Sequence, residues 1–361
     1  MECGCQASTG SAATTALRCR SVDLTTVADD LLVVHDGVRV LRREGLTPAT
    51  TYDVEGLSVT TLPRPDGELL CRFATVNDLH FGEVECGRID DSPEGPIQRA
   101  LPGEPPYPEV MNRGAVAEIA AIDPVAVVAK GDLTADGQPD ELAAFAQLYG
   151  ATFGDRLHVV RGNHDAYKGQ HVYAGDRWIE LPGVAVALLD TVIPTETNGM
   201  LTTAQIEWLD AHAAVSDRPV LVMGHHQQWI ADTEGQQTAH DHRSEGYFGL
   251  KPDPSEALSA VAARRRSIIA YTAGHTHRHR VRHMPCGVPS IEIGCVKDFP
   301  GTWAEYRVYE GGIMQVVHRV SSPAALAWSE RCRHLYRDFG VDYETYALGA
   351  LEDRCCNIPL R

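Results

Sequence analysis

Short apolar runs alternate with longer stretches of helical character through most of this chain. The apolar runs, predicted as buried strands, lie at 71–77, 125–129, 157–160, 184–189, 220–223 and 268–272. The helical stretches lie between them, at 113–122, 139–149, 203–214 and 254–266. Strands that alternate with helices predict an α/β fold in which sheets are covered by helices. Strand-like runs return at 289–293, 305–309 and 313–320.

The regions on either side of this pattern differ from it. Residues 1–20 are small and polar without periodicity, which predicts a flexible tail. Residues 21–70 predict a small β unit, and its Leu-x-Pro-x-Thr-x-Tyr run from Leu46 to Tyr52 resembles fibronectin type III domains. Residues 71–320 form the main domain, and 321–361 a helical extension. An apolar stripe at 323–339 must be buried, either within the chain or against a second subunit in a homodimer.

Composition narrows the classes of function. The 361 residues include 32 Lys and Arg against 49 Asp and Glu, a net charge of −17, which disfavours binding to a nucleic-acid polymer. No apolar run is long enough to predict a membrane span. The first residues lack the features of a secretory signal, so we expect a cytoplasmic protein. The ten cysteines show no C-x-x-C pair and predict free thiols rather than a zinc site.

Polar side chains with metal-binding chemistry follow nearly every predicted strand of the main domain. Ligands gather at the carboxyl ends of strands in α/β sheets, so these side chains can converge on one edge. A single polar residue at the end of a strand more often caps a helix or shapes a turn, but the joint occurrence of these residues favours a shared site. Carboxylate, imidazole and amide oxygen suit a pair of hard-to-borderline divalent metals. The residues are Asp78, His80, Asp132, Asn163, His225, His275 and His277.

Five ordered blocks make the chain similar to the calcineurin-like metallophosphoesterases. They are Asp78-x-His80, Gly131-Asp132, Gly162-Asn163-His164-Asp165, Gly224-His225 and Gly274-His275-x-His277. The resemblance implies a four-layer α+β sandwich with two mixed sheets flanked by helices. Details around Asp132 and at 189–209 resemble the class III cyclic-nucleotide phosphodiesterase and glycerophosphodiesterase group. The N-terminal β unit instead resembles purple acid phosphatases, but no tyrosine follows in the Gly-Asp block, so their purple chromophore is not expected.

The resemblance also implies a role for each residue of these blocks. Asp78, His80 and His277 would hold a first metal, Asn163, His225 and His275 a second, and Asp132 would bridge them. The ligand set accommodates divalent or trivalent iron, manganese, zinc or cobalt. His164 would be the catalytic histidine near the leaving group, oriented by a hydrogen bond that its ring donates to the catalytic residue Asp165. His226 is an alternative to His225 as ligand, because the family's usual His-x-Pro is replaced here by His225-His226-Gln227.

These roles predict a hydrolase of a small phosphate ester. A metal-bridging hydroxide would attack phosphorus in line, and His164 would assist the leaving group. A phosphodiester is favoured, either a cyclic nucleotide or a glycerophosphodiester. A phosphomonoesterase and a non-catalytic metal-binding scaffold remain alternatives. Two long loops, 81–109 and 227–253, are expected to wall the pocket. Candidate substrate contacts are His226, His240, His242 and Arg278.

Overall fold

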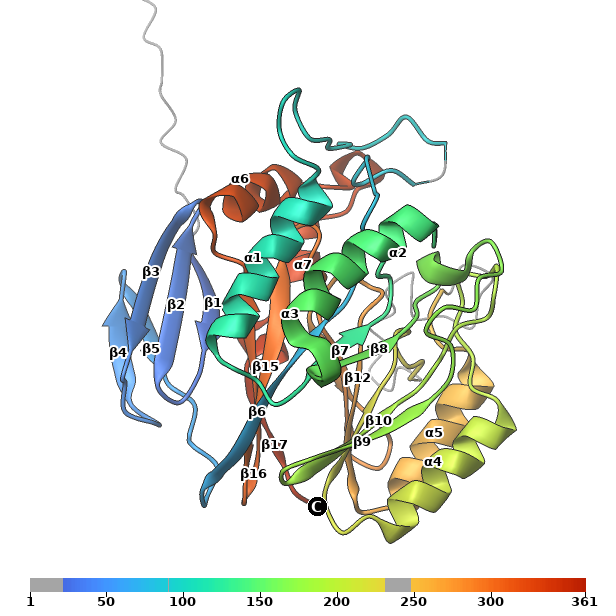
Figure 1. Ribbon diagram of the computed structural model, residues 1–361. Coiled ribbons are helices and arrows are strands. Elements are labelled where there is room, and N and C mark those ends of the chain that lie inside the picture. The colour runs from blue at the N-terminus through green and yellow to red at the C-terminus, as the bar shows by residue number, and fades with distance from the viewer. Residues whose placement is uncertain (1–21, 90, 231–247) are drawn as a thin grey trace, which may run out of the picture.

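Two six-stranded mixed sheets pack face to face at the centre of the molecule (Figure 1). The structure is a computed structural model that describes residues 22–89, 91–230 and 248–361. The first sheet has the order β17-β16-β15-β6-β7-β8, and β6, β7 and β8 run parallel. Its strands are β6 (Leu69–Val76), β7 (Val127–Lys130), β8 (Leu157–Val160), β15 (Thr302–Tyr309), β16 (Gly312–Arg319) and β17 (Cys356–Pro359).

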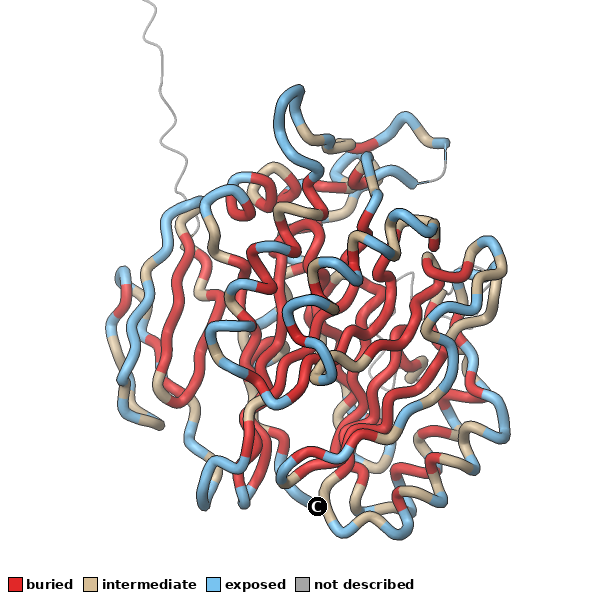
Figure 2. The backbone as a smooth tube through the Cα atoms, viewed as in Figure 1, coloured by how far each residue is buried: buried red, intermediate tan, exposed pale blue. Residues whose placement is uncertain are grey.

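The second sheet has the order β13-β14-β12-β11-β10-β9. Its four inner strands are parallel, and antiparallel strands close both edges. The strands are β9 (Arg177–Leu181), β10 (Val184–Leu188), β11 (Val220–Met223), β12 (Ile268–Ala273), β13 (Arg280–His283) and β14 (Pro289–Glu292). The central strands are buried along their length, as Figure 2 shows, which explains their continuous apolar sequences.

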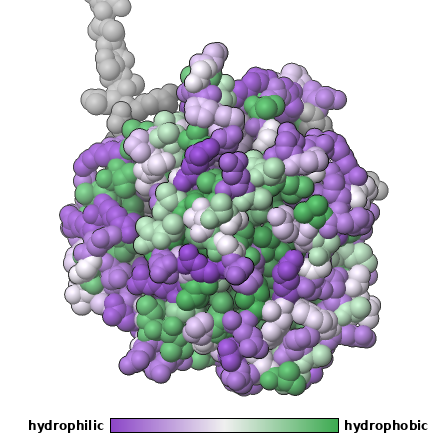
Figure 3. Space-filling model, viewed as in Figure 1, coloured by the Kyte–Doolittle hydropathy of each residue, from purple (hydrophilic) through white to green (hydrophobic). Residues whose placement is uncertain are grey.

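Helices cover the outer face of each sheet. α1 (Tyr107–Ala121), α2 (Pro139–Phe145), α3 (Ala151–Phe153) and α6 (Pro323–Cys332) lie on the first sheet, and α4 (Thr203–Val215) and α5 (Pro252–Arg264) on the second. Residues alternate between the layers, so that Phe73 lies between the sheets and Ala74 faces the helices. On the face drawn in Figure 3, hydrophobic and hydrophilic residues are interspersed. In the described part of the chain, no helix has the length and apolar character needed to cross a membrane.

The N-terminal strands pack on the half of the first sheet that the helices leave uncovered. β1 (Asp23–Val27), β2 (Leu31–Asp36) and β3 (Arg39–Glu44) form an antiparallel sheet, followed by a hairpin of β4 (Thr51–Val54) and β5 (Leu57–Thr60). Leu32 and Val34 of this unit share an apolar cluster with Met314 and Val316 on the outer face of β16. Figure 1 shows the unit in the same layer as α1 and α6.

The chain after α6 forms short elements that return to the sheets. They are α7 (Tyr343–Leu348), α8 (Leu351–Arg354) and the edge strand β17. The predicted helix at 323–339 ends at Cys332, and turns follow it. Its apolar stripe is buried within the same chain, where the ring of Trp328 stacks on Tyr107 at 4.0 Å.

The predicted fold class is confirmed: two mixed sheets flanked by helices, with a small antiparallel unit at the N-terminus. Sequence analysis did not predict β9 and β17. Both are short edge strands, and β9 carries charged residues. An edge strand is half exposed, so its sequence lacks the continuous apolar run of a central strand.

Candidate metal centre

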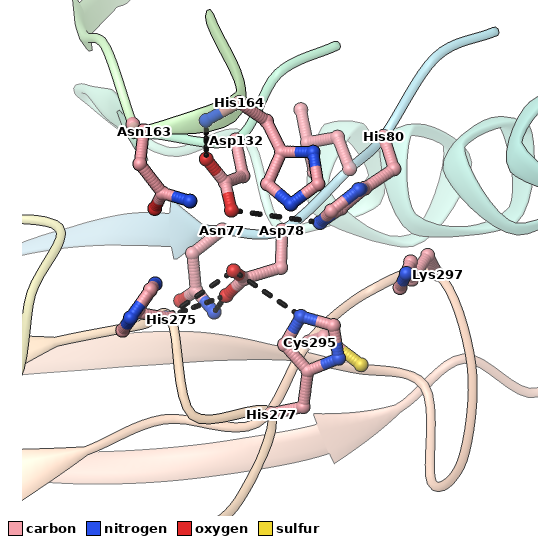
Figure 4. Close-up of polar contacts among 12 residues, drawn as sticks. Asn77, Asp78, His80, Asp132, Asn163, His164, His275, His277, Cys295 and Lys297 are labelled. Atoms are coloured by element: carbon pink, nitrogen blue, oxygen red, sulfur yellow. Dashed lines mark hydrogen bonds and ion pairs between the residues drawn. The ribbon is translucent and has the colours of Figure 1, made fainter. Parts of the chain in front are cut away.

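The candidate ligands follow the carboxyl ends of strands from both sheets. Asp78 and His80 follow β6, Asp132 follows β7, and Asn163 follows β8. In the second sheet, His225 follows β11 and His275 and His277 follow β12. Figure 4 shows these side chains, apart from the unlabelled His225, in one place, and His225 Nε2 lies 2.9 Å from Asn163 Oδ1. The structure therefore joins residues that lie up to 199 positions apart, His277 and Asp78 being the most distant.

The turns that carry these residues have unusual backbone conformations. Asp78, His80, Asp132, His275 and His277 all have positive φ, between 48° and 68°. Non-glycine residues rarely adopt this region, and such strain gathers at functional sites. Gly131 (φ 88°) is required for a further reason: a Cβ there would lie 2.6 Å from His225 Nδ1. The strands thus end in tight turns that direct polar groups into a small space.

One group of donor atoms comes from Asp78, His80 and His277. One donor atom from each of the three residues lies within 4.8 Å of the others. His277 Nε2 is 3.4 Å from Asp78 Oδ1, and His80 Nε2 is 3.6 Å from Asp132 Oδ2. Both ring nitrogens of His80 are buried without a hydrogen-bond partner among the described residues. An unpaired buried imidazole is costly, so this ring fits the role of a metal ligand.

A second group lies beside the first and shares Asp132 with it. His225 Nε2 is 2.9 Å from Asn163 Oδ1, 3.2 Å from His275 Nδ1 and 3.3 Å from Asp132 Oδ2. Asp132 Oδ2 thus faces His80 on one side and His225 on the other. Four ligand atoms of three chemical types converge on one point. The geometry fits two neighbouring cations that share one carboxylate.

Outer hydrogen bonds orient the donors of the second group. His225 Nδ1 donates to the carbonyl of Lys130 (2.9 Å), and His275 Nε2 to that of Phe248 (2.8 Å). Each ring therefore turns its other nitrogen to the centre. Asn163 Nδ2 donates to the hydroxyl of Tyr167 (2.6 Å), which leaves the amide oxygen facing His225. In the first group, Asn77 Nδ2 donates to Asp78 Oδ2 (2.6 Å).

The electrostatics of the site favour the neutral form of some imidazoles and the charged form of others. Burial, with the nearby charge of Lys297, lowers the pKa of His80 well below its usual value. Burial also lowers the pKa of His275 to about 3. Burial opposes a charge on His225, but the Asp132 carboxylate outweighs it and raises the pKa of His225 to about 9. The centre thus holds two neutral imidazoles, those of His80 and His275, beside carboxylates that favour positive charge on His225 and His277.

His164 lies at the edge of the centre. Its backbone N–H donates to Asp132 Oδ1 (2.9 Å), and its ring is 4.5 Å from that of His80 (Figure 4). The expected hydrogen bond to Asp165 is replaced by one to a backbone carbonyl, since His164 Nδ1 is 2.8 Å from the oxygen of Ala135. A tight turn at residues 164–166 directs the two neighbouring side chains apart.

Asp165 instead joins the turns that carry the ligands. Its carboxylate accepts backbone N–H bonds from Gly162 (2.8 Å), Leu133 (3.1 Å) and Thr134 (2.9 Å). Burial, with the charge of Asp132 nearby, raises the pKa of Asp165 to about 6. Asp165 therefore fixes the backbone after β7 against the backbone after β8.

The candidate substrate contacts have different surroundings. His226 is buried, with Nδ1 2.8 Å from Thr191 Oγ1 and Nε2 3.0 Å from the carbonyl of Thr197. Arg278 is buried and donates to Glu292 Oε2 (2.9 Å). His240 and His242 lie outside the described residues. Both ring nitrogens of His226 thus have protein partners, whereas His225 turns one nitrogen to the centre.

Sequence analysis missed three residues that support the candidate ligands. Asn77 and Tyr167 each lie within two positions of a recognised motif. A polar side chain so close to a motif could have been proposed as a hydrogen-bond partner of the ligands. Asp298, whose Oδ2 is 3.2 Å from His277 Nδ1, lies 21 positions after it and had no local signal.

Residues 71–279 match the family model of the calcineurin-like phosphoesterases. The chain belongs to this family. The matched segment spans all five blocks of candidate ligands. Family membership makes the chain a metal-dependent phosphoesterase, and the donor clusters fit the binuclear centre of the family. The proposed resemblance is thus confirmed at the level of the superfamily.

Two solved structures are similar to this phosphoesterase, and the first of them supports its fold. A dimetal phosphatase from Danio rerio is 15% identical with a TM-score of 0.53, over 81% of this chain and 100% of that one. A purple acid phosphatase from seeds of yellow lupin (Lupinus luteus) is 13% identical with a TM-score of 0.48, over 79% of this chain and 60% of that one. No curated protein matches the chain in sequence.

Proposed function

We propose that this phosphoesterase hydrolyses a phosphodiester with two metal ions bound at the described centre. Asp78, His80 and His277 would hold the first ion, Asn163, His225 and His275 the second, and Asp132 both. The observation that carries the proposal is the position of Asp132 Oδ2, 3.6 Å from His80 Nε2 and 3.3 Å from His225 Nε2. A single carboxylate oxygen close to nitrogen donors of both groups suits a bridging ligand.

The bound ions would supply Lewis-acid activation of the phosphoryl group and a water-derived nucleophile near neutral pH. The residue that would supply a proton to the leaving group is His164. Its Nδ1 is held by the carbonyl of Ala135, so its Nε2 is the nitrogen that can hold and deliver a proton. Its ring is only partly buried, so a substrate oxygen can reach it. We therefore assign His164 as the general acid for the departing alkoxide.

The charges around the centre favour a diester over a monoester. A diester carries one negative charge, whereas a monoester near neutral pH carries about two and benefits from a further cation. In the described ranges, the cations that flank the site in sequence are already paired with carboxylates: Arg161 with Asp190, Lys168 with Asp136, Arg278 with Glu292 and Lys297 with Glu83. Lys130 is buried, and its Nζ donates to the carbonyl of Ala273 (3.2 Å).

A comparison of two aryl esters tests this proposal. The protein is reconstituted with Mn²⁺ and assayed on bis(p-nitrophenyl) phosphate and on p-nitrophenyl phosphate, which share a leaving group. We expect kcat/KM to be at least about tenfold higher for the diester, a difference of about 1.4 kcal/mol in transition-state binding. A preference for the monoester would support the phosphomonoesterase alternative. Two bound metals without turnover of either ester would support the non-catalytic scaffold.

A panel of natural esters would then separate the two favoured diesters, a cyclic nucleotide and a glycerophosphodiester. The identity of the metals, among iron, manganese, zinc and cobalt, and a cytoplasmic location stay predictions. A homodimer also stays a prediction. The apolar stripe at 323–339 no longer supports it, because that stripe packs within the chain.

A further inference from the structure

The C-terminal segment is bonded to the loop that carries two candidate ligands. Thr276 stands between His275 and His277, and its carbonyl accepts a hydrogen bond from the hydroxyl of Tyr346 (3.0 Å). The backbone N–H of His279 donates to the carbonyl of Ala347 (3.2 Å). Both contacts come from α7, which lies more than sixty positions further along the chain. α7 therefore holds the backbone of this loop by two hydrogen bonds.

A third contact from α7 reaches a ligand through one buried carboxylate. Asp298 is fully buried, and its Oδ2 is 3.2 Å from His277 Nδ1. Its other oxygen, Oδ1, accepts from the hydroxyl of Tyr343 (2.8 Å) and from Cys295 Sγ (3.0 Å). Figure 4 shows one ring nitrogen of His277 facing Asp78 and the other turned toward Cys295. The path Tyr343–Asp298–His277 thus connects α7 to the first group of donors.

The geometry of Asp298 suits the orientation of a metal-binding imidazole. A carboxylate that accepts the Nδ1 proton fixes the tautomer in which Nε2 carries the free electron pair. His277 Nε2 lies 3.4 Å from Asp78 Oδ1, within the first group. The neighbouring cation, Lys297, is paired with Glu83 at 2.7 Å. The donors to the Asp298 carboxylate are Tyr343, Cys295, His277 and, at 3.7 Å, the thiol of Cys86.

We propose that Asp298 is a positioning residue for His277, and that Tyr343 holds Asp298 in place, so that the C-terminal segment sets the affinity of the first metal. The inference rests on the proposed function, since it needs His277 to be a ligand. It gives the extension at 321–361 a part in the metal centre. Burying a charged carboxylate costs free energy unless hydrogen-bond donors surround it. Asp298 is buried and has such donors, and one of them is the candidate ligand His277.

Metal titration tests the proposal without an activity assay. The metal-free protein is titrated with Mn²⁺ alone by calorimetry, as wild type, Asp298→Asn and Tyr343→Phe. We expect two sites in the wild type, and a loss of about 10–100-fold in affinity at one of them for Asp298→Asn. Tyr343→Phe, which keeps the ring, is expected to lose about 3–10-fold at the same site. The other site stays unchanged in both variants.

A matched control and a double-mutant cycle separate positioning from general destabilisation. Tyr306→Phe removes another buried hydroxyl, which bonds to Gln315 at 3.1 Å in the core, and should leave both affinities unchanged. In a His277→Ala background, Asp298→Asn should cause no further loss, because the ring that it orients is absent. If Asp298→Asn does not fold, the same cycle is run with Tyr343→Phe.

The outcomes distinguish this inference from the proposed function. A wild type that binds fewer than two metals would overturn the proposed function. A wild type with two sites, and unchanged affinities in Asp298→Asn and Tyr343→Phe, would overturn the inference alone. An equal loss at both sites, or a further loss in the His277→Ala background, would also overturn it and show a merely structural role.

Discussion

Replacement of His164 by alanine should separate proton delivery from metal binding. The ring is anchored through Nδ1 by the carbonyl of Ala135, at 2.8 Å, so its Nε2 is the nitrogen available to a leaving oxygen. The backbone N–H of His164, which donates to Asp132 Oδ1, is retained in His164→Ala. We therefore expect both metals to stay bound. The rate should fall by about 10²–10⁴-fold, or about 3–5 kcal/mol in barrier, for a leaving group that needs a proton.

The assay is a series of aryl and alkyl phosphodiesters whose leaving groups differ in pKa. Wild-type rates should depend weakly on the leaving group, because His164 protonates the poor ones. His164→Ala should show a steep dependence, with a loss of about tenfold or less for p-nitrophenolate, which departs without a proton. Equal losses across the series would refute the acid role, and loss of metal from the variant would refute its separation from the ligands.

Three further predictions concern stability and the second metal. Trp328→Ala removes the ring stacked on Tyr107 and should lower the free energy of unfolding by about 3–5 kcal/mol in urea denaturation; less than 1 kcal/mol would contradict the buried stack. Burial lowers the pKa of His35 to about 3, so its stabilising contribution is complete above pH 6.5 and falls by about 1.4 kcal/mol per unit down to pH 3. His35→Gln should remove that part of the acid sensitivity, and an unchanged pH profile would contradict it. Tyr167→Phe frees the amide of Asn163 and should weaken the second metal about tenfold in a Mn²⁺ titration, with the first unaffected; equal affinity would contradict the orienting role.

The sequence allowed much of the site to be predicted because the chemistry lies at strand ends. Parallel strands end at one edge, so Asp78, Asp132 and Asn163 could be expected to meet although they are far apart in the chain. The same reasoning extends to the second sheet, where His225 and His275 follow strands that were visible as apolar runs. The face-to-face packing of the two sheets then brings the groups together, as the resemblance implied.

Contacts set by turns and by distant segments could not be predicted in this way. His164 and Asp165 are adjacent, but the turn between them directs one to Ala135 and the other to backbone amides. Arg278 follows a ligand, yet it is bonded to Glu292 on β14, a partner that only the tertiary structure reveals. Asp298 meets His277 through tertiary packing, which no spacing in the sequence encodes.

The central claim is that Asp132 is shared by two metals that carry out hydrolysis. The most direct measurement is the metal content per chain, together with turnover of bis(p-nitrophenyl) phosphate, for wild type and Asp132→Ala after reconstitution with Mn²⁺ and desalting. The account predicts two metals per wild-type chain, at most one in the variant, and a loss of activity of more than about 10³-fold. Two metals and undiminished turnover in Asp132→Ala would contradict it.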